Sequence, residues 1–452
     1  MADIAPSPFH LATEAALRVS LADFAEANKL SIWVAIVNAT ERFAVPLGTS
    51  DGGSTGATIH DILPVGSYAK PWVAVAVLRL VERGVISLED RAAPLIDPFL
   101  ERINSTTLGE IYGPHFAAVT VHDLLHMTAG LDRYGDDWVH AYTLDDPHWD
   151  LGPLDYLAEL IRHNETHVQC MCSGPGPPCV ASTACCNVSG GGNDRQHCPD
   201  YNSINFMLLG LLYGAQTGAV RWEDVDIKAA VLGTSEKPAR YADTEFYVRG
   251  ECSTYPRTVH YFDWCGPPSS RTGCGTYPTG PIDMFNRSCL NGWAFGNAGT
   301  SALDAASFFY DLLGRRTLLN ASTVAAMRQF GPGVVMGSVP YGLGIWKTDQ
   351  LSIDGRENEG TVNASFPGIA DYLVYEGHAG DDYGTISRQG WHAKLNLSFS
   401  IMVNRQFGTY PEYGTNTHGL YCHVWKVLFN VLSLDFDEAF ACPPIAAHKS
   451  RR

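Results

Sequence analysis

A serine and a lysine lie one helical turn apart at the head of a strongly apolar run, in the segment GSYAKPWVAVAVLRLVERG of residues 66–84. Between positions 72 and 81 only Arg79 is polar, which predicts a helix enclosed by protein on most sides. An i, i+3 spacing places Ser67 and Lys70 on the same face of that helix. A chain that buries such a pair needs a large core around it and a partner for the lysine.

Ser67 and Lys70 therefore form a candidate activated nucleophile. A serine hydroxyl attacks poorly at its free pKa, so an enzyme that uses one places a base within hydrogen-bond reach. Burial would lower the pKa of the Lys70 ammonium group toward that of a usable base. The pair alone is a weak signal, because Ser67 could also be a helix cap and Lys70 a solvated side chain of the first turn.

Two later segments could complete a site of this kind. In PDYNSINFMLLGLLYG, residues 199–214, Tyr201 precedes an apolar helix-like stretch, although taken alone it could be a core aromatic residue. In YEGHAGDDYG, residues 375–384, His378 stands before two small residues. Small residues at a strand edge let the backbone approach a substrate closely.

In this order the three segments resemble the motifs of the serine β-lactamase-like superfamily, which includes class C β-lactamases, D-alanyl carboxypeptidases and related esterases. There, Ser-x-x-Lys is followed by Tyr-x-Asn and by Lys-Thr-Gly, or by His-Thr-Gly in esterase-like and eukaryotic members. Three more stretches are similar to family segments in the expected order, so the resemblance spans residues 30 to 430. They are VTVHDLLHMTAGLDRY (119–134), GNAGTSALDAASFFYDLLGRRTLLNASTVAAM (296–327) and PYGLGIW (340–346).

The resemblance implies a role for each matching residue. Ser67 would be the nucleophile, and Lys70 and Tyr201 would share its proton. The backbone amides of Ser67 and Asp381 would hold the oxyanion that forms during acyl transfer. No metal or organic cofactor is expected for this chemistry.

The sequence departs from the superfamily pattern at two positions. Ser203 stands where the Tyr-x-Asn motif has its asparagine, so a substrate-binding role there would rest on one hydroxyl. Ala379 stands where the third motif has threonine, between His378 and Gly380, which match. We expect His378 to orient Tyr201 or the substrate, and the 378–380 triplet to contact the substrate.

The pattern of strands and helices predicts an α/β protein of the α+β type with a β-lactamase/transpeptidase-like fold. SIWVAIVN near residue 31 and the late segments YLVYEG, GTISRQG and LNLSFSIMV predict strands of one antiparallel sheet, and HGLYCHVWKVLFNVL a closing helix. We expect one catalytic unit over residues 1–450. Its α/β lobe would comprise 1–63 and 331–442, and its mainly helical lobe 64–330, with insertions at about 164–198 and 225–290.

Composition limits the partners of the chain. It has 452 residues, 45% of them hydrophobic and 17% charged, and no run of eighteen apolar residues, so no membrane span is expected. The formal net charge of −17 disfavours binding to nucleic acid or to an anionic membrane surface. The expected partner is a small-molecule substrate, and the oligomeric state stays open.

Cysteine usage is the second informative feature. In loop-like stretches rich in glycine and proline, even-numbered groups of cysteines favour local disulfides, although their pairing cannot be read from sequence. Zinc is the rival interpretation, because His163, His167 and His197 lie nearby, but clean C-x-x-C pairs are missing. The twelve cysteines are Cys170, Cys172, Cys179, Cys185, Cys186, Cys198, Cys252, Cys265, Cys274, Cys289, Cys422 and Cys442.

Glycosylation sequons help to decide between these interpretations. Their number favours passage through a eukaryotic secretory pathway, and with it an oxidising environment, although the start MADIAPSPFH does not resemble a signal peptide. We set Asn396 aside, because LNLSFSIMV reads as a half-buried strand. The candidate acceptors are Asn38, Asn104, Asn164, Asn187, Asn286, Asn320 and Asn363.

Three functions remain open at this point. The leading hypothesis is a secreted serine hydrolase that cleaves a small ester or amide through an acyl-enzyme. A β-lactamase or D-alanyl carboxypeptidase is the alternative enzyme. A catalytically silent secreted glycoprotein with the same fold is the alternative without turnover, favoured only by Ser203 and Ala379.

Overall fold

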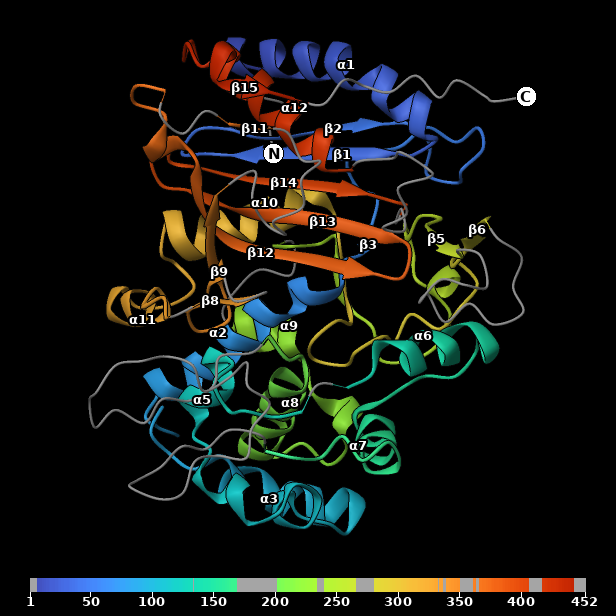
Figure 1. Cartoon of the computed structure of the whole chain (residues 1–452), viewed down its shortest axis with the longest axis vertical. Coiled ribbons are helices and arrows are strands. Elements are labelled where there is room, and N and C mark those ends of the chain that lie inside the picture. The colour runs from blue at the N-terminus through green and yellow to red at the C-terminus, as the bar shows by residue number, and fades with distance from the viewer. Residues whose placement is uncertain are drawn as a thin grey trace.

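Six strands from the two ends of the chain form one antiparallel sheet, in the order β10-β12-β13-β14-β1-β2 (Figure 1). The computed structural model describes residues 6–132, 134–168, 201–233, 240–265, 280–331, 333–335, 339–349, 361–362, 366–405 and 417–442. The strands of the sheet are β1 (Ile32–Val37), β2 (Arg42–Leu47), β10 (Trp346–Asp349), β12 (Val374–Asp382), β13 (Thr385–His392) and β14 (Leu397–Val403).

Helices cover both faces of this sheet. On one face, alternate residues of β1, such as Val34, pack in a core with α1 (Pro8–Asn28) and α12 (Thr417–Val431). The residues between them, such as Trp33, face a second core that includes α10 (Ala302–Phe309). Because both faces are buried, the strand reads IWVAIV without the polar alternation of a one-sided sheet.

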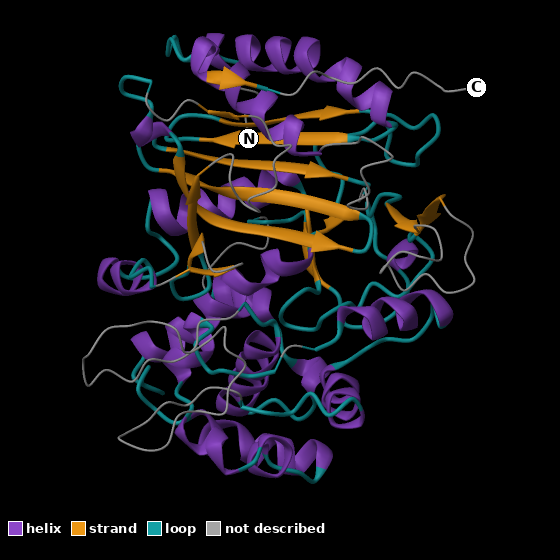
Figure 2. Cartoon of the chain, in the orientation of Figure 1, coloured by secondary structure: helices purple, strands orange, loops and turns teal. Residues whose placement is uncertain are grey.

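A largely helical region lies beneath the sheet (Figure 2). Its centre is α2, in which every residue from Ala69 to Leu78 is buried, and α8, which is buried from Ile204 to Gly214. Helices that are apolar all round need cover on every side, and the surrounding helices supply it. The helices of this region are α2 (Ala69–Glu82), α3 (Ala92–Asn104), α4 (Leu108–Tyr112), α5 (Val121–His126), α6 (Asp136–Asp145), α7 (Pro153–Arg162), α8 (Ile204–Thr217), α9 (Ile227–Leu232) and α11 (Ala321–Met327).

The other described strands form four smaller sheets. A three-stranded sheet in the order β3-β7-β4 lies next to the start of α2, and the pair β5-β6 belongs to the segment before residue 290. The short strands are β3 (Leu63–Pro64), β4 (Thr244–Phe246), β5 (Phe262–Cys265), β6 (Gly280–Asp283), β7 (Ala298–Thr300), β8 (Gly333–Val335), β9 (Val339–Pro340), β11 (Thr361–Val362) and β15 (Phe440–Ala441).

The structure confirms the predicted α+β class, the antiparallel sheet built from early and late segments, and the closing helix. The lobe boundaries stay predictions, although α10 packs against β1 and β14 and so contacts the sheet from within the stretch 64–330. Within the described residues, no helix is both long and apolar enough to cross a membrane.

Candidate active site

Ser67 lies in a single turn of 3-10 helix, Gly66–Tyr68, that leads directly into α2. Gly66 has a φ of +47°, and a Cβ placed on it would lie 1.9 Å from the carbonyl oxygen of Asp381. Only glycine fits there, because the turn presses against strand β12 and its backbone adopts the left-handed region. The sequence thus brings Ser67, which is partly exposed, to the edge of the main sheet.

Lys70 is 0% exposed, and its Nζ atom lies 2.7 Å from Ser67 Oγ. The same ammonium group donates to the carbonyl oxygen of Phe295 at 3.1 Å. Its Nζ atom also lies 5.0 Å from the centre of the Tyr201 ring, within range of a cation–π interaction. A lysine is almost never buried without such partners, so this position holds the amine against the serine hydroxyl.

Tyr201 stands just before α8, half-buried beside the nucleophile. Burial raises the pKa of its phenol well above the usual value, while a hydrogen bond with Ser67 lowers it. The phenol therefore keeps its proton at neutral pH. Asn202, which sequence reasoning left without a role, anchors this segment through its side-chain amide, which donates to the carbonyl oxygens of Leu131 at 2.9 Å and Asp132 at 2.6 Å.

Ser203 is 7% exposed and begins α8 through its carbonyl oxygen, which accepts from the amides of Phe206 at 3.0 Å and Met207 at 3.2 Å. These bonds give Ser203 a structural role at the helix start. A contact between its hydroxyl and a substrate stays a prediction.

His378 is buried in β12 and makes contacts through both ring nitrogens. Its Nδ1 lies 2.5 Å from the carbonyl oxygen of Ala379, and its Nε2 lies 3.1 Å from the hydroxyl of Tyr341. The ring also stacks on Trp346 with the centroids 4.4 Å apart. Burial, reinforced by the nearby Lys70 charge, lowers the pKa of His378 to about 3, so the imidazole is neutral at physiological pH.

Tyr341 and Trp346 surround His378, and sequence reasoning did not assign them to the site. Both lie in the PYGLGIW stretch, and the resemblance of this stretch to a family segment is the sequence signal that could have assigned them to the site. The Tyr201 and His378 rings lie 6.0 Å apart, and Tyr341 lies 6.1 Å from Tyr201. His378 is thus near Tyr201, with its Nε2 paired to Tyr341.

One edge of β12 pairs with β10 in its first half and contacts the Ser67 turn in its second half. Strand β10 pairs with Val374–Gly377 only, and from His378 onward this edge faces the Ser67 turn. A Cβ on Gly380 would lie 1.8 Å from the carbonyl oxygen of Val65, so this strand also needs glycine for its approach. The backbone around Asp381 therefore lies against the turn that carries Ser67.

Carboxylates occupy the end of β12. Asp381 is exposed, whereas Asp382 is 7% exposed. Burial raises the pKa of Asp382 to about 6; hydrogen bonds from Asn291 and from the Tyr383 amide oppose this rise, and the charges of Asp263 and Asp381 add to it. Asp382 therefore adds its negative charge to this side of the site above about pH 6.

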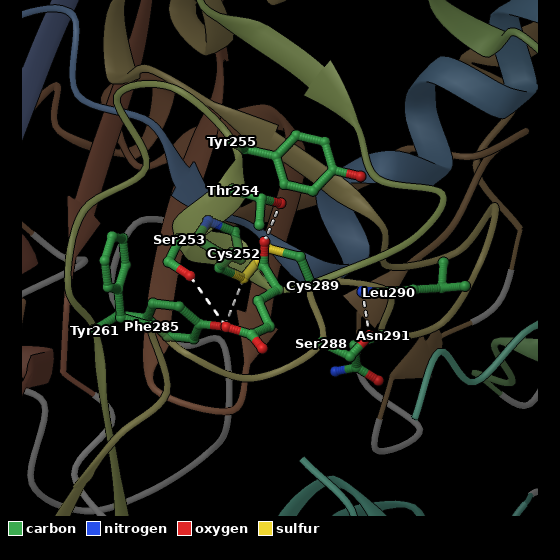
Figure 3. Close-up of a disulfide and its surroundings, with 12 residues drawn as sticks. Cys252, Ser253, Thr254, Tyr255, Tyr261, Phe285, Ser288, Cys289, Leu290 and Asn291 are labelled. Carbon is green, nitrogen blue, oxygen red and sulfur yellow. Dashed lines mark hydrogen bonds between the residues drawn. A yellow bond between two sulfur atoms is a disulfide. The ribbon is translucent and has the colours of Figure 1, made fainter. Parts of the chain in front are cut away.

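Two disulfides lie within the described residues. Cys252 pairs with Cys289 and Cys422 with Cys442 (Figure 3 shows the first pair). Within the described part of the chain, no cluster of three or more metal-binding side chains occurs. Cys274 and the group from Cys170 to Cys198, with His197, lie outside the described residues, as does the side chain of Cys265.

Sequon asparagines in the described residues lie at the surface. Asn38 is half-exposed, and Asn104, Asn164, Asn286 and Asn320 are exposed, while Asn187 and Asn363 lie outside the described residues. Asn396 corrects an expectation, because it lies exposed in the turn between β13 and β14, before the buried strand begins. The strand interpretation of LNLSFSIMV was right from Leu397 onward and wrong for Leu395 and Asn396.

This fold, with a buried lysine against a serine at the sheet edge, is a β-lactamase/transpeptidase-like fold. A family model described as Beta-lactamase matches residues 34–168. Together, the fold and this match over part of the chain support the resemblance to the serine β-lactamase-like superfamily. No curated protein sequence matches the chain.

Solved structures agree on the fold over most of the chain. The D-amino acid amidase from Ochrobactrum anthropi SV3, complexed with L-phenylalanine amide, aligns with a TM-score of 0.63 at 16% identity, covering 92% of this chain and 99% of that one. A D-stereospecific amidohydrolase from Streptomyces sp. gives 0.56 at 20% identity, covering 88% and 94%. A penicillin-binding protein from Bacillus halodurans gives 0.58 at 18%, covering 92% and 99%.

Proposed function

We propose that the protein is a serine hydrolase that cleaves a small ester or amide through an acyl-enzyme on Ser67. The observation that carries the proposal is the 2.7 Å contact between Lys70 Nζ and Ser67 Oγ, made by a lysine that is fully buried. A structural lysine gains little from such a position, whereas a general base needs it.

In the proposed reaction, the Ser67 oxygen adds to the substrate carbonyl carbon, and the carbonyl π electrons move to its oxygen. The coupled pair of Lys70 and Tyr201 first loses one proton to solvent, and the Ser67 proton then passes to this pair. The backbone amides of Ser67 and Asp381 hold the oxyanion. Its collapse breaks the bond to the alcohol or amine, which leaves with that proton. Water then adds in the same way, releases the acid and returns the proton to Ser67.

Two of the similar structures are an amidase and an amidohydrolase, which supports amides as one substrate class. The charges at the site limit the class of substrate further. His378 is neutral, Ala379 lacks a hydroxyl, and Asp381 and Asp382 add negative charge. A substrate carboxylate would be repelled there, so we propose a neutral ester or an amide that carries an amine.

Two alternatives remain. A β-lactamase or D-alanyl carboxypeptidase activity is favoured by the structural likeness to a penicillin-binding protein. A silent glycoprotein is favoured by the replacements at Ser203 and Ala379. We also propose that the protein is secreted and glycosylated, which the two disulfides and the surface position of the described sequons support.

Hydrolysis of a short-chain chromogenic ester by the purified protein tests this function. Ser67→Ala is the inactivating variant, and Ser54→Ala, an exposed serine in a surface loop, is its matched control. Turnover that is lost in Ser67→Ala and kept in Ser54→Ala supports the hydrolase. Equal rates in all three proteins favour the silent glycoprotein. A chromogenic cephalosporin run in parallel identifies a β-lactamase if it alone is hydrolysed.

A further inference from the structure

Asn291 contacts the end of β12, the strand that carries the Asp381 amide proposed for the oxyanion hole. The side-chain amide of Asn291 donates to Asp382 Oδ1 at 2.6 Å. Asp382 is the last residue of β12 and follows Asp381 directly. This contact joins two segments that are 91 residues apart in the chain.

Asp382 is held firmly by this contact. Its Oδ1 also accepts from the amide of Tyr383 at 2.8 Å, and the residue is nine-tenths buried. In the register with β13, Asp382 lies opposite Thr385 and Asp381 opposite Ile386. Because the two aspartates share a peptide bond, fixing the side chain of Asp382 restricts how the backbone of Asp381 can turn.

Asn291 is itself fixed by a disulfide two residues earlier. Cys289 is bonded to Cys252, and its carbonyl oxygen accepts from the Asn291 amide at 3.1 Å (Figure 3). The amide of Cys289 donates to Gly250 at 2.9 Å, which ties the segment down a second time. Figure 3 shows Ser288 to Asn291 continuing directly from this bridge.

We propose that Asn291 is a positioning residue, which holds the end of β12 through Asp382 and is itself held by the Cys252–Cys289 disulfide. The inference rests on the proposed function, because fixing the end of β12 matters for catalysis only if the Asp381 amide binds the oxyanion. Donors of an oxyanion hole act only when they are fixed before reaction. The Cys252–Cys289 disulfide, Asn291 and Asp382 thus together restrict the movement of the end of β12.

The charges around Asp382 explain why an amide is needed at position 291. Asp263 of β5 faces Asp382 and is paired with His140 of α6 at 2.5 Å. The carboxylate of Asp381 lies on the other side, and the buried phenols of Tyr247 and Tyr261 are also close. A carboxylate in place of Asn291 would repel Asp382, whereas the amide donates to it.

Asn291→Ala tests the role of the contact in ester hydrolysis. We expect kcat to fall about tenfold to a hundredfold with little change in KM, because a displaced oxyanion donor weakens binding of the transition state alone. The matched control is Asn430→Ala, which removes another asparagine–aspartate hydrogen bond, to Asp437 at 3.0 Å. Equal kcat values in the two variants would overturn the proposal.

Asn291→Asp gives a readout that a purely structural role would not change. At about pH 8 two carboxylates would face each other, and we expect kcat to fall as in Asn291→Ala. As the pH is lowered below about 6, one shared proton restores the hydrogen bond, and kcat relative to the wild type should rise. A ratio of the two kcat values that stays constant with pH would contradict the proposal.

Removing the Cys252–Cys289 disulfide tests whether it helps to hold Asn291 in place. Cys252→Ser with Cys289→Ser should lower kcat. Cys422→Ser with Cys442→Ser removes the bridge between α12 and the residue that follows β15, and should lower stability only. The reverse pattern would overturn the role given to the Cys252–Cys289 bridge.

Hydrogen exchange separates failure of this inference from failure of the proposed function. We expect Asn291→Ala to raise exchange in residues 381–386, and Asn430→Ala to leave it unchanged. If the wild-type protein shows no Ser67-dependent turnover, the proposed function fails and this comparison alone decides whether Asn291 holds the strand. Equal exchange in both variants would refute the positioning role.

Discussion

His378 Nε2 accepts a hydrogen bond from the hydroxyl of Tyr341, with 3.1 Å between the two atoms and both side chains buried. The direction follows from the other ring nitrogen, because Nδ1 faces the Ala379 carbonyl oxygen and must carry the proton. The third motif of the site is therefore occupied by a neutral, fixed ring, and the amine that contacts the nucleophile is that of Lys70.

Tyr341→Phe tests this pairing. It leaves Nε2 of His378 as a buried acceptor without its donor, so we expect the free energy of unfolding to fall by about 1–3 kcal/mol. We also expect kcat to fall several-fold, since the ring loses one of the contacts that orient it beside Tyr201. Denaturant unfolding and ester hydrolysis measure the two effects.

Tyr241→Phe is the matched control for this change. It removes a buried phenol hydrogen bond to Asp311 Oδ2, 2.6 Å long. It should lower stability by a similar amount and leave kcat unchanged. A loss of activity in both variants would mean that general destabilisation, and no specific contact of His378, explains the effect.

Gly66→Ala should abolish activity, because the new Cβ would meet the Asp381 carbonyl oxygen at 1.9 Å and push the Ser67 turn away from β12. Gly84→Ala is a matched control, since Gly84 also has a positive φ, of +67°, but its Cβ would point into open space. We expect Gly84→Ala to cost about 1–2 kcal/mol of stability through backbone strain alone, with kcat retained. Similar kcat losses in both variants would show that strain, rather than the close approach, matters.

Much of the fold and part of the site could be predicted from sequence, for identifiable reasons. Strands such as β1 and helices such as α2 have continuous apolar sequences, which predict buried elements without knowledge of their neighbours. Ser67 and Lys70 are only three residues apart, so their contact could also be predicted locally. Tyr341, Phe295 and Asn291 escaped prediction, because each acts through a contact with a residue far away in the chain. Such contacts leave no periodic signal.

The error at Asn396 has a local cause. Alternation of apolar and polar residues predicted a strand that includes this residue, but the chain turns there with a φ of +46°, a conformation that asparagine tolerates better than most residues. Turn chemistry therefore overrode the strand pattern at its first two residues, Leu395 and Asn396.

Asp382→Asn should change stability in a pH-dependent way. Asparagine can keep both hydrogen bonds that Oδ1 accepts, but it cannot ionise. The folded-state pKa of Asp382 is raised from 3.8 to about 6, so the folded protein binds this proton more tightly and loses stability as the pH rises through that range. Above about pH 6 the variant should be more stable by as much as about 3 kcal/mol, and below about pH 4 equal to the wild type. Thermal unfolding at several pH values checks this, and a constant difference would contradict the assignment.

Lys70→Met should separate catalysis from folding at the centre of the site. Removing the proposed base should lower kcat about 10²–10⁴-fold. Methionine fills a similar apolar volume, and replacing a buried charge by a well-packed apolar residue is often neutral or stabilising, so the unfolding temperature should hold or rise. Lys228→Met is the matched control, since the ammonium group of Lys228 also donates to a backbone carbonyl oxygen, that of Thr244, at 2.6 Å. If Lys70→Met unfolds at a lower temperature and keeps its turnover, Lys70 is a structural residue and the proposed mechanism is wrong.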